Sequence, residues 1–202
     1  MKETVCRCEN VVKIDVHDPI DLDKNIDMLE NIANGNMPGS KCEACGSYVW
    51  APLPLGFTAK SKGLNFVVLP EEERISVYMG KNNKPNEVLL GYQELFERAR
   101  IIRDGLDPLI LELMKYALEA KAAENSDSDE IRAIYNGMSN KGLVFHITGI
   151  KADESAVIIL PKTSYESSLA NMHKNQDKEP YRSLKKGNYH SIKKLDFSEN
   201  GE

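Results

Sequence analysis

All four cysteines of this 202-residue chain lie in its first quarter, where they form two close pairs. The first pair is Cys6 and Cys8, in Val-Cys-Arg-Cys, and the second is Cys42 and Cys45, in Cys-Glu-Ala-Cys-Gly. Two close pairs of thiolates can surround one zinc ion tetrahedrally while the segment between the pairs folds as an insertion. The spacing therefore predicts one metal site with these four cysteines as ligands and zinc as the cofactor.

The composition is typical of an ordinary globular protein, with 41% hydrophobic and 28% charged residues. A net charge of -5 argues against a general nucleic-acid-binding protein, which is usually basic. No stretch approaches the roughly 18 apolar residues of a membrane helix, and the first residues lack the features of a signal peptide. We therefore expect a cytoplasmic protein, in which reduced thiols favour metal binding over disulfides.

The pattern predicts an α+β fold that begins with a small, mainly β, zinc-closed domain over residues 1–80. Apolar residues at helical spacing predict an inserted helix over residues 22–33, with Asp21 as its N-cap and Gly35 just after its end. Gly46 follows the second cysteine pair, where a metal knuckle needs positive φ. Strands are expected at residues 12–16, 47–51, 64–70 and 75–79.

A polar segment over residues 81–86 separates this domain from a predicted helical hairpin over residues 87–123. Its first helix contains Leu89 to Ile102, and its second begins with Asp107 as N-cap and Pro108 in the first turn. An acidic connector over residues 124–130 follows. The chain is then expected to form a small α+β region over residues 131–175, with strands at 142–148 and 156–160 and a helix at 164–172, and a polar, basic tail over residues 176–202.

Little else in the sequence indicates chemistry. His17 is the nearest alternative ligand, and His146, His173 and His190 are isolated. The acidic run at residues 127–129 lacks the glycine and glutamate of a calcium loop, so we reject calcium there. Basic and aromatic residues alternate in the tail and could hold single-stranded nucleic acid, but a solvated tail is the favoured interpretation. Catalytic motifs are missing from the sequence, so an enzyme would require groups that only folding brings together.

Several of these motifs together resemble the CpXC domain, a bacterial and archaeal domain of uncharacterised function. The shared features are the paired cysteines, the acidic helical insert, the Pro-Leu-Pro-Leu-Gly-Phe run at residues 52–57, and residues 64–70. The segment from Gly91 to Asp107 is similar to the helical extension of some members, so the resemblance covers residues 4–120. The family's usual Cys-Pro-x-Cys is here Cys6-Arg7-Cys8, one residue shorter and without the proline.

The cysteine spacing is also similar to the zinc switch of redox-regulated holdase chaperones. In that family oxidation forms disulfides, releases zinc and exposes a client-binding surface. Two functions therefore follow from the sequence. The first is a non-enzymatic binding or scaffold module with a structural zinc site, whose partner is a protein if it has one. The second is a redox-sensitive chaperone or sensor.

Overall fold

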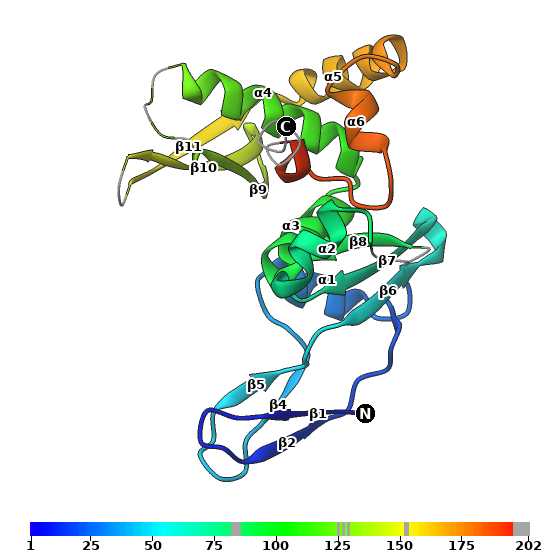
Figure 1. The fold of residues 1–202 in the computed structure, drawn as a ribbon, viewed down its shortest axis with the longest axis vertical. Coiled ribbons are helices and arrows are strands. Elements are labelled where there is room, and N and C mark those ends of the chain that lie inside the picture. Colours follow the sequence, from blue (N-terminus) through cyan, green and yellow to red (C-terminus); the bar gives the residue numbers. More distant parts are fainter. Residues whose placement is uncertain (82–85, 125, 127, 129, 152–153, 196–202) are drawn as a thin grey trace. The chain divides into compact units, whose positions relative to one another are not determined.

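The computed structural model describes residues 1–81, 86–124, 126, 128, 130–151 and 154–195 (Figure 1). The chain forms two compact units, Met1–Ala99 and Arg100–Glu202. Both units combine helices with antiparallel or mixed sheets, so the predicted α+β class is confirmed. No helix within the described ranges is long and apolar enough to cross a membrane.

Two hairpins make up the first part of the N-terminal unit, and we call them the ribbon (Figure 1). In the first hairpin β1 (Lys2–Val5) pairs antiparallel with β2 (Val11–Ile14), and in the second β4 (Gly39–Lys41) pairs antiparallel with β5 (Tyr48–Trp50). β2 contacts β4, and Val12 and Ile14 of β2 are buried. The strands predicted around residues 12–16 and 47–51 are therefore confirmed.

The rest of the N-terminal unit is built on a four-stranded sheet. Its order is β3 (Ile20–Asp21), β6 (Leu55–Ala59), β7 (Leu64–Leu69) and β8 (Glu87–Leu90). β6 and β7 are antiparallel, and the outer two pairings are parallel. The rings of Phe57 and Phe66 stack in its core with centroids 5.3 Å apart. The helix α1 (Ile26–Ala33) follows β3, and α3 (Gly91–Arg103) follows β8.

Three local predictions in this unit are wrong. Residues 75–79 form the short helix α2 (Arg74–Tyr78), not a strand, after a 3-10 turn at Glu71–Glu73. The N-cap of α1 is Asn25, because the N–H of Leu22 donates to Thr58 O at 2.8 Å and keeps residues 20–22 extended beside the sheet. Leu89 and Leu90 belong to β8, and the helix begins only at Gly91, whose φ of 70° interrupts the strand.

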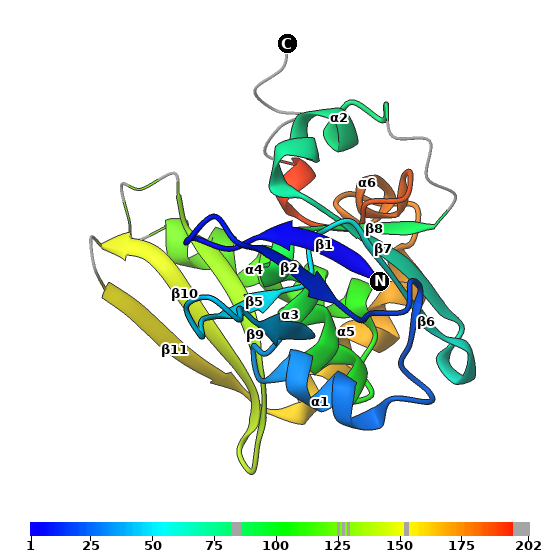
Figure 2. The same cartoon turned by 90° about the horizontal axis from the view of Figure 1, so that it is seen from below.

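The C-terminal unit contains a three-stranded antiparallel sheet, whose strands lie side by side in Figure 2. Its order is β11 (Glu154–Leu160), β10 (Gly142–Lys151) and β9 (Arg132–Ser139). The helix α4 (Pro108–Ala123) contacts β9, β10 and the helix α5 (Lys162–Asn175). β10, β11 and α5 confirm the predicted elements, whereas β9 was not predicted. Buried Tyr135, Leu143 and Phe145 lie in the core between sheet and helices.

The start of α4 follows the predicted capping pattern. Asp107 Oδ1 accepts hydrogen bonds from the backbone N–H of Leu109 at 2.8 Å and of Ile110, and Pro108 occupies the first turn. Both helices of the predicted hairpin therefore exist as α3 and α4. Their packing as a hairpin stays a prediction, as do the four domain boundaries. The linker proposed at residues 81–86 falls mostly outside the described residues, as does part of the connector at 124–130.

The predicted solvated tail is wrong for its described part, residues 176–195. It forms the helix α6 (Tyr181–Lys185), and Leu184 has no exposed surface. Glu112 of α4 binds the tail. Its Oε2 accepts a hydrogen bond from Ile192 N at 2.8 Å, and its Oε1 pairs with Lys115 Nζ at 2.6 Å. Residues 196–202 of the predicted tail lie outside the described residues. Other buried tail residues are Tyr181, Tyr189 and Ile192.

Leu184→Ala should therefore destabilise the C-terminal unit by about 2–5 kcal/mol, because it leaves a cavity under a packed segment. Chemical denaturation of the full chain measures the loss in the free energy of unfolding. Arg182→Ala is the matched control, since its side chain is 71% exposed and pairs with the neighbouring Glu179. That control should cost under about 1 kcal/mol. An equally small loss for both variants would contradict a packed tail.

Candidate metal centre

The first cysteine pair lies in the turn between β1 and β2. Cys6 N donates to Asn10 O at 2.9 Å, and Glu9 N donates back to Cys6 O at 2.8 Å. Glu9 has a φ of 66° and is the one non-glycine residue with positive φ in the described parts of the chain. A left-handed conformation at this residue turns the chain tightly enough to place both cysteines of the short Cys-Arg-Cys sequence at the tip of the hairpin.

The second pair lies in the corresponding turn between β4 and β5. Cys42 N donates to Ser47 O and Gly46 N donates to Cys42 O, both at 2.8 Å. Gly46 has a φ of 74°, as the sequence predicted for a metal knuckle. In each turn the residue directly after the second cysteine is therefore left-handed. The shortened first pair and the ordinary second pair close in the same way.

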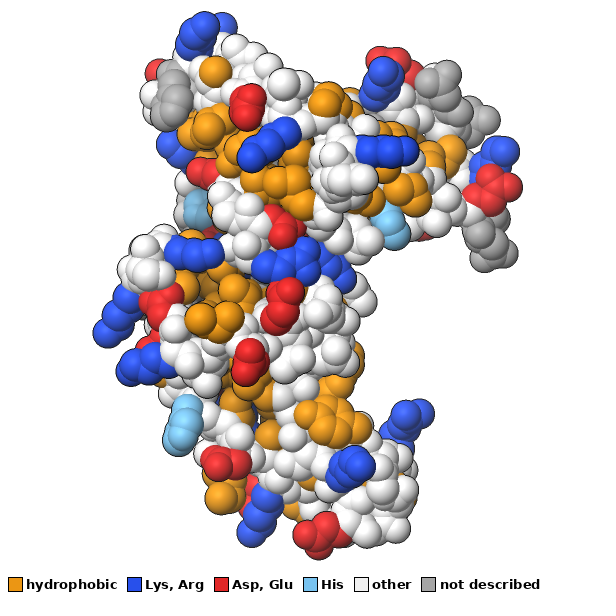
Figure 3. Space-filling view, turned by 180° about the vertical axis from the view of Figure 1, so that it is seen from behind, with side chains coloured by type: hydrophobic (Ala, Val, Ile, Leu, Met, Phe, Trp, Pro, Cys, Tyr) orange, Lys and Arg blue, Asp and Glu red, His pale blue; other side chains and the backbone are white. Residues whose placement is uncertain are grey.

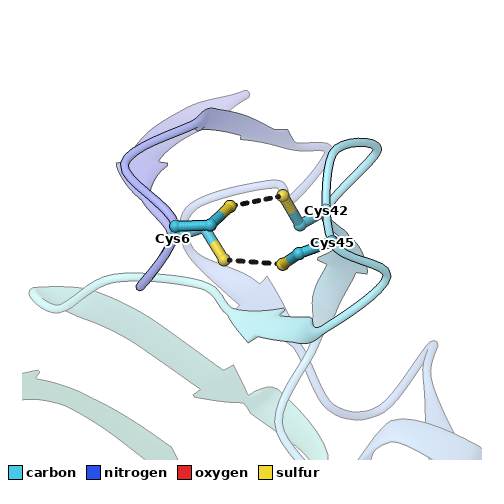
Figure 4. Close-up of side chains that lie close together, drawn as sticks. Cys6, Cys42 and Cys45 are labelled. Atoms are coloured by element: carbon cyan, nitrogen blue, oxygen red, sulfur yellow. Dashed lines mark hydrogen bonds between the residues drawn. The ribbon is translucent and has the colours of Figure 1, made fainter.

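The two tips bring all four cysteine sulfurs together. Cys6 Sγ lies 3.5 Å from Cys45 Sγ, Cys8 Sγ lies 3.6 Å from Cys42 Sγ, and all four sulfurs are within 4.8 Å of one another. Figure 4 shows Cys6 of the first hairpin facing the two cysteines of the second. Sulfurs bound to one tetrahedral zinc at about 2.3 Å are about 3.8 Å apart, so the observed spacing fits such an ion.

Burial and hydrogen bonding distinguish the four thiols. Cys6 and Cys42 are buried, whereas Cys8 and Cys45 are exposed, and none is in a disulfide. The hydroxyl and the backbone N–H of Ser47 lower the pKa of Cys45 to about 6, and the backbone N–H of Cys45 lowers the pKa of Cys42. The backbone N–H of Asn10 lowers the pKa of Cys8, but the sulfurs of Cys45 and Cys42 raise it to about 12.

The raised pKa of Cys8 has an electrostatic cause in the neighbouring sulfurs. A negative charge on one sulfur disfavours a second charge a few ångströms away, so thiols this close titrate as a coupled set. Backbone N–H groups favour charge on the second pair, and Cys8 keeps its proton. All four can be thiolates together only if a cation lies among them. The arrangement can therefore hold a metal ion.

The histidines lie elsewhere. Among the described residues, the four cysteines are the one grouping of three or more potential metal-binding side chains, and His17 is outside it. His146 Nε2 lies 3.2 Å from Asn136 Nδ2, and His190 Nδ1 lies 2.9 Å from Leu184 O. The side chain of His173 and the rejected calcium positions Asp127 and Asp129 are outside the described part of the structure.

One feature of the N-terminal unit was missed by the sequence analysis. A groove with a volume of about 540 Å³ is lined by aromatic, proline and glutamate side chains, including Trp50, Tyr92 and Glu72. These residues are far apart in the sequence, so no local motif could have indicated the groove. The available signal was the chain's single tryptophan, placed on a strand next to a proline-rich run.

Comparison with known proteins identifies the family. The model of the CpXC protein family matches residues 4–115, a range that includes all four cysteines. A protein of Treponema pallidum (strain Nichols), described only as an uncharacterized protein, is 23% identical over 216 aligned residues, which cover 96% of this chain and 98% of the relative. No solved structure gives a significant match. Because the family match covers more than half of the 202 residues, this chain belongs to the CpXC protein family.

Proposed function

We propose that this protein is a non-enzymatic binding or scaffold module whose ribbon is closed by one structural zinc ion. The observation that carries the proposal is the convergence of four sulfurs within 4.8 Å from the tips of two hairpins. Four thiolates fill a tetrahedral coordination sphere and leave no position for water or substrate, as is typical of structural zinc. The ligands are Cys6, Cys8, Cys42 and Cys45.

The ribbon has too little core to be stable without such an ion. Its two hairpins are each two-stranded, and isolated two-stranded hairpins are marginal in water. Few of its side chains are buried, and two of them are the ligands Cys6 and Cys42. Zinc binding supplies about 10–16 kcal/mol in small metal-dependent modules, and this energy becomes folding energy. Zinc would therefore act here in place of a hydrophobic core.

The cysteine site is consistent with the expected location of the protein in a reducing compartment, the cytoplasm. Cys45 is exposed and has a lowered pKa, and an exposed thiolate oxidises readily where reductants are absent. Four reduced cysteines are required if all of them are to bind one ion.

Purified, tag-free protein should contain one zinc per chain by elemental mass spectrometry. Cys42→Ser should lower the zinc content, because it removes a soft ligand. Without the ion, amide hydrogen exchange should become fast in β1, β2, β4 and β5, while β6 and β7 keep their protection.

Ser40→Ala is the control for that experiment, since it changes β4 two residues before Cys42 without touching a ligand. It should keep its zinc and its protection. Folded protein without zinc and with four freely reactive thiols would contradict the proposal. Iron in place of zinc would contradict the identity of the ion.

Gly46→Ala should weaken zinc binding about fivefold, whereas Glu9→Gly should not weaken it. A Cβ at Gly46 meets no atom within 4 Å, so the loss comes only from the left-handed backbone, which costs about 1 kcal/mol. Glu9 already bears this strain, and glycine removes it. Competition with a chromogenic chelator measures both affinities. An equal loss in both variants would show that the two turns do not close in the same way.

A second candidate, the redox-sensitive zinc switch, is favoured by the sulfur pairing. The contacts of 3.5 Å between Cys6 and Cys45 and of 3.6 Å between Cys8 and Cys42 join the two hairpins. Peroxide could oxidise each pair to a disulfide, with one peroxide reduced to two waters per bond formed. Zinc would leave, because disulfide sulfurs are no longer thiolate ligands.

Peroxide treatment separates the two candidates. For a structural site we expect zinc release without any gain of chaperone activity, measured as light scattering of a thermally unfolding client enzyme. Reduction followed by zinc addition should restore the starting protein. Suppression of client aggregation that appears only after oxidation would contradict a purely structural site and support the switch.

A further inference from the structure

No cysteine lines the groove of the N-terminal unit, which is built around three aromatic rings. Trp50 of β5 meets Tyr92 edge to face with centroids 5.2 Å apart, and meets Phe96 in the same way at 5.8 Å. Tyr92 and Phe96 both belong to α3. The Tyr92 hydroxyl donates to Ala51 O at 3.0 Å and so fixes the helix against the end of β5. The rings are therefore held in place before any ligand arrives.

The aromatic side of the groove is accessible to a ligand. Trp50 keeps 38% of its surface exposed although it contacts two other rings. Pro52, Leu53 and Pro70 add apolar surface beside it. Exposed tryptophan in a concave, apolar site is typical of a binding surface, because the large ring contributes much contact area for little entropy.

The groove is also acidic. Glu71 and Glu72 line it, and none of its described lining residues is a lysine or arginine. Glu71 is already paired with Arg74, and its carboxylate lies close against Gly91. Glu72 is exposed and makes no ion pair with any residue that the structure describes. One carboxylate beside the aromatic rings is thus available to a cation.

Charges of both signs are spread over the face shown in Figure 3, where lysines and arginines lie among acidic side chains. Within the groove, the attraction for a cation comes at short range from the groove's own carboxylate.

We propose that this groove binds an arginine side chain on an exposed peptide segment of a partner protein. A guanidinium stacks on aromatic rings, gains cation–π energy best from tryptophan, and matches a carboxylate with two parallel hydrogen bonds. Glu72 supplies the carboxylate and Trp50 the ring. Thr4 and Gln93 line the same groove and supply uncharged hydrogen-bonding groups for the peptide backbone. The proposal rests on the proposed binding role and names the partner's chemistry.

Trp50 is the only tryptophan in the chain, so its fluorescence reports directly on the groove. The reduced full-length protein, with its zinc content measured, is titrated with N-acetyl-arginine methylamide. The matched ligand is N-acetyl-citrulline methylamide, which has nearly the same shape without the charge. We expect a saturable change for arginine, at least about fivefold weaker binding for citrulline, and weaker arginine binding at high salt.

Two glutamine variants test the role of the free carboxylate. Glu72→Gln should weaken arginine binding about fivefold or more and remove most of its salt dependence. Glu73→Gln is the control, because Glu73 is the exposed neighbour that does not line the groove, and it should stay within about twofold of the natural protein. Both changes are at exposed side chains, and circular dichroism checks that both variants fold.

The outcomes are separable from those of the zinc experiment. Equal responses to arginine and citrulline, or no saturable change with arginine, would overturn the groove proposal even in protein that contains zinc. If tetramethylammonium binds the groove as tightly as the arginine compound does, the proposed arginine peptide would be overturned in favour of a small cation as the ligand. Arginine binding by protein without zinc would leave the groove proposal intact and contradict only the proposed dependence of the ribbon on zinc.

Discussion

Mutual repulsion of four sulfur atoms within 4.8 Å is the constraint on which the N-terminal unit depends. Two hairpin tips can stay together in this arrangement either with protons on several thiols or with a cation among the thiolates. The pKa values of Cys8 and Cys45, about 12 and about 6, correspond to the state without a cation, in which some thiols keep their protons. A divalent ion would remove the inequality, because every sulfur would then face positive charge.

The hairpins that hold the sulfurs also carry one wall of the groove. Thr4 lies in β1 and Trp50 in β5, so both belong to the strands that are joined by the cysteine-containing turns. Other lining residues come from the start of α3 and from the 3-10 turn at Glu71–Glu73. A metal ion that fixes the hairpins would therefore also fix the part of the groove that they carry.

The cluster of four cysteines could be predicted from the sequence because each pair of cysteines is local. Cys-x-x-Cys-Gly specifies its own turn, and the shorter first pair closes through a left-handed Glu9, which no sequence rule would have selected. Mostly apolar runs also predicted β7, β10 and β11. The strand predicted at residues 75–79 was wrong, because Ile75 and Met79 are exposed and only Val77 is buried in α2. Three glutamates directly precede that helix, and acidic residues stabilise a helix N-terminus. They were the available signal for a helix here.

The remaining errors concern interactions between distant residues. β8 is a strand because it pairs in parallel with β7, and the tail is ordered because Glu112 accepts from Ile192 across 80 residues of sequence. The average polarity of the tail concealed the few apolar residues, such as Leu184, that decide its packing. The groove could not be predicted for the same reason, since its lining residues are spread along the sequence from Thr4 to Phe96. Chemistry encoded by neighbouring residues can be inferred before folding, whereas a recognition surface assembled across a whole unit requires the structure.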